Sequence, residues 1–154
     1  MDMLVKLYAL PDASEIFASL ARDGFSVRRA MAPDRHKVVA FVKKEFSEAW
    51  ASETEVAFAR VPVACFIAAR GRELIGFANH DATSANFFGP TGVHPRARNK
   101  GVGKALLFAC LEDMRAQGFA YAIIGGVGPA EFYAKTVGAV AIDGSAPGIY
   151  RGLL

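Results

Sequence analysis

The chain has 154 residues, 53% of them hydrophobic and 21% charged, which fits one folded domain and excludes general disorder. Its apolar stretches end well before the ~18 to 20 residues of a membrane-spanning helix, and residues 1–6 lack a secretory start, so we expect a soluble, cytoplasmic protein. The net charge of +3 is local: residues 82–111 contain four basic and no acidic residues, against 14 basic and 15 acidic residues elsewhere. A short basic segment, rather than a basic surface, therefore needs an explanation.

The first half of the chain alternates strand and helix patterns. A capping-box pattern over residues 12–15 opens a helix that Gly24 ends, and Pro33 with Asp34 opens a second, amphipathic helix. Residues 46–55 indicate irregular structure or a short helix. The predicted strands of this half are residues 4–10 and 25–30, followed by a hairpin of 65–69 and 74–77 around a turn at 70–73.

The second half predicts a crossover connection. A strand over residues 85–94 leads through a long helix, 99–117, to an almost wholly apolar strand, 120–125, and we expect these two strands to be parallel with a right-handed connection. A short helix at 129–138 and closing strands at 140–142 and 148–153 complete the order. The whole order predicts an α/β fold with helices packed on a mixed sheet.

The two cysteines, Cys65 and Cys110, lie in apolar surroundings without a cysteine or histidine at ligand spacing. We expect both to be buried, reduced thiols. The sequence therefore predicts neither a disulfide nor a metal site.

The segment from Val93 to Leu106 combines a strand end, a basic glycine loop and the start of a helix. The free N–H groups of a helix start attract anions, and glycine lets a phosphate approach the backbone, so the pattern favours a phosphorylated ligand. Two common phosphate motifs do not fit. A P-loop needs glycine at position 98 and Ser or Thr at 105, and a dinucleotide fingerprint needs glycine at 106.

The remaining pattern, Arg98-x-x-Gly101-x-Gly103, resembles motif A of the GNAT N-acetyltransferase superfamily, whose loop binds the pyrophosphate of acetyl-CoA. Residues 129–135, Pro-Ala-Glu-Phe-Tyr-Ala-Lys, resemble its motif B in order and spacing. The resemblance extends over residues 26–154. It implies an acyl-CoA N-acyltransferase fold for a single domain, 1–154, in which residues 1–24 form an extra βα unit.

The resemblance implies an enzyme that transfers an acetyl group from acetyl-CoA to a primary amine by direct attack, with no acyl-enzyme and no metal. Tyr133 would protonate the departing thiolate, and an aromatic pocket with Trp50, Glu53 and Phe88 would receive the amine. The expected cofactor-binding residues are Gly92, Val93, Arg98, Asn99, Lys100, Gly101, Val102, Gly103, Lys104 and Phe132.

Three departures from the superfamily pattern concern this site. Strand 85–94 contains no carboxylate where many relatives have a catalytic glutamate, Gly126 replaces a common asparagine, and four residues instead of three separate Tyr133 from Gly138. The general base therefore stays open, with Asp81 as the assigned candidate. The other candidates are His80, Glu53 and Glu55.

The missing carboxylate also motivates an alternative, a non-catalytic acyl-CoA-binding regulatory module. A nucleic-acid-binding protein is disfavoured because the aromatic residues are not interleaved with the basic ones. We expect no membrane partner. A homodimer is compatible with the extra N-terminal strand, which could extend the sheet or pair with a second subunit.

Overall fold

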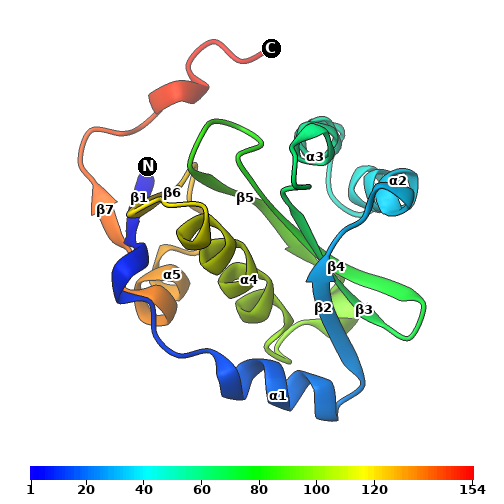
Figure 1. Cartoon of the computed structure of the whole chain (residues 1–154). Coiled ribbons are helices and arrows are strands. Elements are labelled where there is room, and N and C mark those ends of the chain that lie inside the picture. Colours follow the sequence, from blue (N-terminus) through cyan, green and yellow to red (C-terminus); the bar gives the residue numbers. More distant parts are fainter.

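The computed structural model describes residues 1–154, which form a mixed sheet of seven strands with five α-helices (Figure 1). No helix has the length and apolar character to cross a membrane. The strands are β1 (Asp2–Lys6), β2 (Phe25–Arg29), β3 (Cys65–Arg70), β4 (Glu73–His80), β5 (Phe87–Val93), β6 (Tyr121–Ile124) and β7 (Val140–Ile142). The helices are α1 (Ser14–Arg22), α2 (Arg35–Glu45), α3 (Glu48–Ala59), α4 (Val102–Ala116) and α5 (Ala130–Val137).

The strand order is β2-β3-β4-β5-β6-β1-β7, and only β5 and β6 are parallel neighbours. The predicted hairpin of β3 and β4 and the predicted parallel pairing across α4 are both confirmed. This arrangement is the predicted α/β fold, a mixed sheet with helices packed on it.

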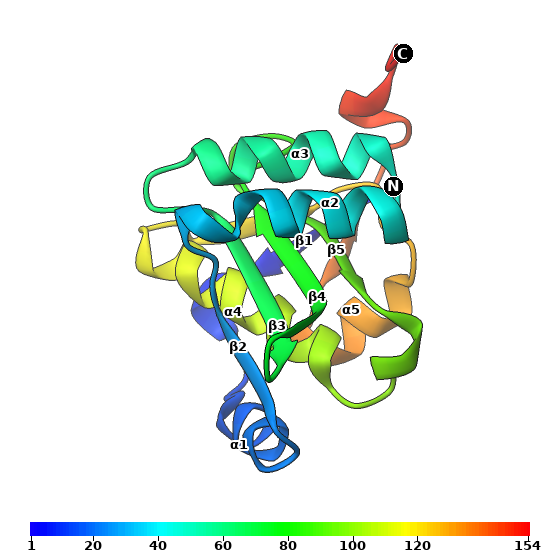
Figure 2. The ribbon, with the colours of Figure 1, turned by 90° about the vertical axis from the view of Figure 1, so that its right-hand side faces the viewer.

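Each face of the sheet has its own hydrophobic core. Helices α1, α4 and α5 pack on one face, where fully buried residues of α4 such as Leu106 and Leu111 belong to one cluster with residues of β1, β4 and β6. Helices α2 and α3 cover the other face over β3 and β4, side by side in Figure 2, with Val42 and Phe77 at the centre of this second core. Cys110 lies in the first core and Cys65 in the second, and both are free thiols, as predicted.

The N-terminal strand lies inside the sheet. β1 pairs antiparallel with β6 on one side and with β7 on the other. Of the two predicted alternatives, extension of the sheet or pairing with a second subunit, the strand therefore follows the first. The buried Asp2 carboxylate accepts a hydrogen bond from the Gly126 N–H at 2.9 Å, and the Asp2 N–H donates to Ser145 Oγ at 2.7 Å. These two bonds join the beginning of the chain to the segments that follow β6 and β7.

Of the two alternatives for residues 46–55, irregular structure or a short helix, the helix is confirmed. These residues belong mostly to the 12-residue helix α3, because Ser47 caps it by accepting a hydrogen bond from the Trp50 N–H at 3.1 Å and the following residues are good helix formers. Two other local predictions were wrong. Residues 148–153 form no strand; Gly148–Tyr150 is a 3₁₀ turn. The strand at 4–10 ends at Lys6, where a 3₁₀ turn over Leu7–Ala9 buries Leu7.

β5 and β6 separate after the second residue of β5. Their ladder pairs Phe87 with Ile123 and Phe88 with Ile124, and no pair follows. The next two residues explain the break: Gly89 has a φ of +113°, which side chains rarely tolerate, and Pro90 has no N–H to donate. The separated strand ends leave an opening in the sheet.

Candidate active site

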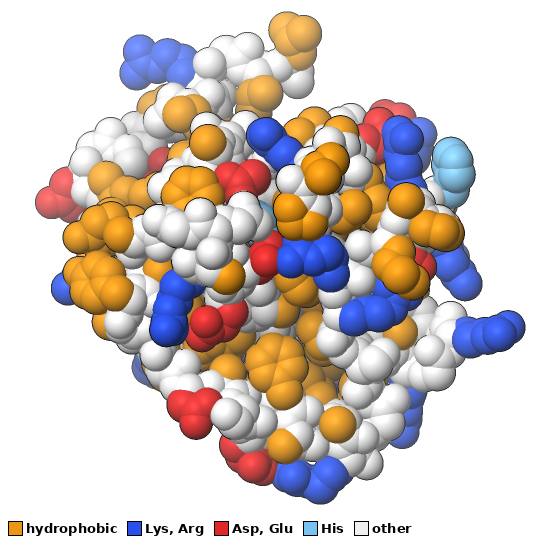
Figure 3. Space-filling model, viewed as in Figure 1, with side chains coloured by type: hydrophobic (Ala, Val, Ile, Leu, Met, Phe, Trp, Pro, Cys, Tyr) orange, Lys and Arg blue, Asp and Glu red, His pale blue; other side chains and the backbone are white.

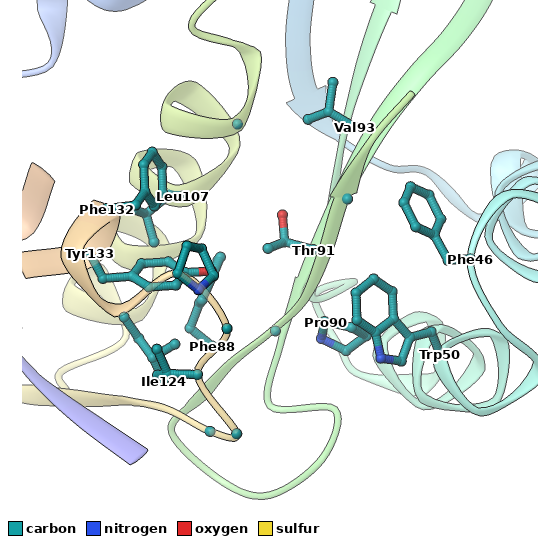
Figure 4. Close-up of a pocket in the computed structure, with 18 of the residues that line it drawn as sticks. Phe46, Trp50, Phe88, Pro90, Thr91, Val93, Leu107, Ile124, Phe132 and Tyr133 are labelled. Carbon is teal, nitrogen blue, oxygen red and sulfur yellow. The ribbon is translucent and has the colours of Figure 1, made fainter. Parts of the chain in front are cut away.

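A cleft of about 490 Å³ occupies the opening between β5 and β6. Figure 4 shows β5 passing between two groups of side chains: Phe132, Tyr133, Leu107 and Ile124 on one side, and Phe46 with Trp50 on the other. A second hollow, of about 760 Å³, continues the cleft along the glycine loop. It shares Val93, Arg98, Gly103, Pro129 and Phe132 with the cleft and adds Ala97, Asn99, Gly101 and Lys104.

The glycine loop presents free backbone donors to this second hollow. None of the N–H groups of residues 99–104 donates a hydrogen bond within the protein. Gly101 precedes α4 with a φ of +89°, and an added Cβ on it would meet nothing within 4 Å. Six consecutive unpaired N–H groups at a helix start, beside Lys104, are suited to an anionic group such as a pyrophosphate.

Arg98 is held at the end of β5, where its Nε donates to the Val93 carbonyl oxygen at 3.2 Å. Its guanidinium is exposed, and the residue lines both hollows. Arg96, by contrast, forms an ion pair with Glu73 on the surface. On the face shown in Figure 3, basic side chains lie among acidic ones. The excess charge of the sequence is thus concentrated near the loop.

Tyr133 projects from α5 into the cleft (Figure 4). Its ring packs edge-to-face on Phe88 and Phe132, with centroid separations of 6.2 and 5.1 Å, and its hydroxyl forms no hydrogen bond within the protein. Burial raises the pKa of Tyr133 to about 12. The phenol therefore keeps its proton throughout the neutral range and can donate it to a group in the cleft.

A smaller hollow of about 290 Å³, which we call the acceptor pocket, adjoins the cleft near Gly89. Glu53 of α3 lies in it, and its Oε1 accepts a hydrogen bond from the Thr83 hydroxyl. The pocket shares Trp50, Phe88, Gly89, Pro90, Gly125 and Gly126 with the cleft and adds Glu53, Thr83 and Tyr150. All three residues of the expected amine pocket are therefore together here.

The structure places Asp81 outside the cleft, in a separate hollow with His80, Arg60 and Gln117. Its Oδ2 is 2.6 Å from His80 Nδ1, and its Oδ1 accepts from the Asn86 N–H at 2.6 Å. Both carboxylate oxygens are thus engaged in the β4–β5 connection. Asp81 has no free oxygen directed at the cleft, so the geometry does not support it as the base.

Two of the expected cofactor residues line neither hollow. Lys100 is exposed, and the Val102 side chain is buried in the core, so only its N–H group faces the loop. Sequence reasoning missed Phe46 and Tyr150. Phe46 packs so closely on Gly92 that a Cβ there would lie 2.4 Å from its ring, and Tyr150 comes from a segment predicted as a strand. No spacing rule connects either residue to the loop.

The sequence matches the family model described as "Acetyltransferase (GNAT) family" over residues 30–138. This match covers more than half of the chain, so the protein belongs to the GNAT acetyltransferase family. No curated protein matches it in sequence.

Solved structures share the fold at low sequence identity. A GCN5-related glucosamine N-acetyltransferase region of a fungal multi-domain GH3 β-N-acetylglucosaminidase is 15% identical with a TM-score of 0.73, over 90% of this chain and 19% of that one. A GCN5-related N-acetyltransferase from Sphaerobacter thermophilus is 19% identical, with a TM-score of 0.69, over 90% and 47%. The chain therefore spans less than half of each of these two proteins. YhbS from Escherichia coli, solved with CoA, is 17% identical with a TM-score of 0.58, over 73% and 67%.

Proposed function

We propose that the protein is an acetyl-CoA-dependent N-acetyltransferase that acts on a primary amine. The observation that carries the proposal is the run of six unpaired N–H groups, residues 99–104, at the end of a cleft that also contains the Tyr133 hydroxyl. The loop residues would hold the pyrophosphate of acetyl-CoA, chiefly through the backbone N–H groups, with Arg98 and Lys104 adding charge. The pantetheine arm would lie between β5 and β6, where no ladder bonds occupy the backbone of residues 89–93 on the β6 side.

In this arrangement the amine attacks the thioester carbonyl directly. Backbone groups at Gly92 and Val93 would stabilise the charge that develops on the carbonyl oxygen. Tyr133 would donate its proton to the departing thiolate as the C–S bond breaks, since the phenol is protonated throughout the neutral range. Tyr133 would act as the acid by itself, without a second titratable group in contact with its hydroxyl.

We assign the general base to Glu53 rather than Asp81. One Glu53 oxygen accepts from Thr83, which leaves the other oxygen for the substrate ammonium, directly or through water. Glu53 also lies in the hollow that adjoins the cleft, as a base for the attacking amine must. This carboxylate supports catalysis over the alternative of a non-catalytic acyl-CoA-binding module.

The first experiment tests the cofactor. Acetyl-CoA at 100 times its Kd should stabilise the fold by about 2.7 kcal/mol, measured as a rise in the midpoint of thermal unfolding. Acetyl-pantetheine carries the same thioester but lacks the pyrophosphate, so it is the matched control and should give a much smaller rise. Equal effects of the two compounds would contradict the assignment of the loop.

The second experiment tests turnover. Release of free thiol from acetyl-CoA is followed with a panel of primary amines and without amine. Amine-dependent release together with detection of the acetylated amine by mass spectrometry supports the transferase. Cofactor binding without turnover of any amine would instead support the regulatory module.

A further inference from the structure

The acceptor pocket has an unusual distribution of charge. Glu53 is the only charged residue among its lining residues, and its other polar side-chain groups are the hydroxyls of Thr83 and Tyr150 and the indole N–H of Trp50. The rest of the wall consists of aromatic rings, a proline and glycines. A substrate ammonium therefore finds one carboxylate, and a substrate carboxylate or phosphate finds no cation.

A second carboxylate increases the negative character of the surroundings. Asp2 lies behind the pocket, where its Oδ1 accepts the Gly126 N–H at 2.9 Å. Burial, together with the carboxylates of Asp2 and Glu53, raises the pKa of Tyr150. Both carboxylates thus disfavour a negative charge at Tyr150, which forms one wall of the acceptor pocket.

Tyr150 limits the size of the pocket. It lies against the chain after β6, where a Cβ on Gly125 would come within 2.3 Å of the Tyr150 hydroxyl oxygen and within 2.9 Å of Phe87. The Gly148 turn that carries Tyr150 follows the segment held by the bond from the Asp2 N–H to Ser145 Oγ. The hollow of about 290 Å³ between Tyr150, Trp50 and Glu53 accommodates a small side group only.

Building on the proposed function, we infer that the acceptor is a small primary amine whose ammonium group is its only charge. Amino acids and phosphorylated amines are excluded, because their anionic group would lie near Glu53 without a counter-charge, and like-charge juxtaposition is strongly unfavourable. Diamines are disfavoured, because Glu53 supplies only one pocket-lining carboxylate. Apolar monoamines and amino sugars share the required chemistry.

The test uses matched pairs that differ by one charged group, with kcat/KM measured for each. The pairs are 2-phenylethylamine with phenylalanine, glucosamine with glucosamine 6-phosphate, and butylamine with 1,4-diaminobutane. We expect the monocationic member to be preferred by at least about 100-fold in any pair with an anionic partner. The relative rates of 2-phenylethylamine and glucosamine then show whether the acceptor is an apolar monoamine or an amino sugar. Equal or faster turnover of the anionic partner, or of the diamine, would overturn the inference.

The role of Glu53 is tested by binding, because Glu53→Gln also lowers turnover if Glu53 is the base. Calorimetric titration of 2-phenylethylamine and phenylalanine into the enzyme saturated with CoA gives the preference without chemistry. In Glu53→Gln the preference should fall to within about 3-fold, since the charge that discriminates is gone. Glu48→Gln, an exposed position at the start of the same helix, should keep the wild-type preference.

The outcomes separate this inference from the function on which it rests. If acetyl-CoA binds and no amine is acetylated, the proposed function fails and the inference fails with it. If amines are acetylated but carboxylated ones react as fast as the others, the inference alone fails. An unchanged preference in Glu53→Gln also overturns it.

Discussion

Tyr133 combines a packed ring with a hydroxyl to which the proposed function gives a chemical role. Its ring is 7% exposed and belongs to the same core as Phe88, while its hydroxyl remains without a partner in the protein. Buried polar groups are normally hydrogen-bonded, so an unpaired hydroxyl in a cleft is a feature of a site rather than of a core. The burial that packs the ring is also what raises the pKa of the phenol.

Replacing Tyr133 by phenylalanine should separate these two roles. The Tyr133→Phe variant keeps the ring contacts and loses the proton donor, so we expect kcat to fall by about 10²- to 10⁴-fold. The KM for acetyl-CoA should change less than about 3-fold, because no binding contact depends on the hydroxyl. Steady-state kinetics of thiol release measures both values, and an unchanged kcat would remove Tyr133 as the acid.

At the scale of elements, the start of α4 shows a conflict between stability and binding. Gly103 lies in the first turn of the helix and lines both hollows, and its φ is not positive. A Cβ there would meet only Val93 Cγ2 at 3.8 Å, an ordinary contact. Nothing inside the protein therefore requires glycine at this position.

The substitution Gly103→Ala should accordingly have opposite effects on folding and on binding. The free energy of unfolding should rise by about 0.5–1 kcal/mol, because alanine is the better helix former. Affinity for acetyl-CoA should fall by at least about 10-fold, because the added methyl group stands where the phosphates approach the backbone. Urea unfolding and calorimetric titration measure the two quantities, and unchanged affinity would show that the ligand does not approach Gly103.

A network of charges joins β2, β4 and α4 behind the site. Asp113 of α4 accepts hydrogen bonds from the Arg29 guanidinium and lies 2.7 Å from His80 Nε2, while His80 Nδ1 contacts Asp81. Burial by itself would raise the pKa of Asp113, but the bonds from Arg29 and His80 hold it below its ordinary value. The network thus positions the β4–β5 connection, which also carries Thr83.

Removal of this carboxylate should weaken the fold in a pH-dependent way. Asp113→Asn leaves Arg29 without its charge partner and His80 with Asp81 as its only carboxylate contact, and we expect a loss of about 2–3 kcal/mol at pH 7. Because the pKa of Asp113 is lowered in the folded state, its contribution is present above an ordinary carboxyl pKa of about 4 and disappears as the pH falls through the lower folded value. Urea unfolding between pH 7 and pH 2 should therefore show a flatter acid limb in the variant. If the acid limbs of the wild type and the variant were parallel, the stability of this region would come from packing and not from the charge of Asp113.

At the scale of the whole molecule, the beginning of the chain and the segment after β7 meet beside the site. β1 separates β6 from β7, and Asp2 connects the Gly126 turn with the segment that leads to Tyr150. In Figure 1 the last residues pass from β7 along the side of the molecule where β1 and β6 lie. The extra N-terminal strand thereby helps to position a wall of the acceptor pocket.

The substitution Asp2→Ala tests this connection. It removes the acceptor for the Gly126 N–H, and we expect a loss of about 1–2 kcal/mol in the free energy of unfolding. The KM for the amine should rise several-fold while the affinity for acetyl-CoA stays unchanged, since neither Asp2 nor its partner Gly126 lines the hollow along the glycine loop. Asp2→Asn retains an oxygen acceptor, so it should recover most of the free energy of unfolding and most of the increase in the KM for the amine should disappear. If the KM for acetyl-CoA rose instead, Asp2 would act on the cofactor side.

The sequence by itself determined the class of fold and the location of the glycine loop with its free N–H groups. Both depend on local physics: strand and helix periodicity, a glycine that allows a positive φ at residue 101, and a helix start with free N–H groups. The long helix, its end at Gly118, the short helix before Gly138 and the two free thiols followed from such local rules. The length of α3 did not, because its alanine-rich sequence has little amphipathic pattern.

Only the tertiary structure decided which carboxylate lines the acceptor pocket. Asp81 and Glu53 are equally acidic in sequence, but the fold engages both oxygens of Asp81 and leaves one oxygen of Glu53 for the pocket. The insertion of β1 between β6 and β7 and the placement of Tyr150 against Gly125 depend on contacts between residues more than 20 positions apart. Such long-range contacts carry no local periodicity, and for that physical reason the acceptor side of the site appears only in the folded chain.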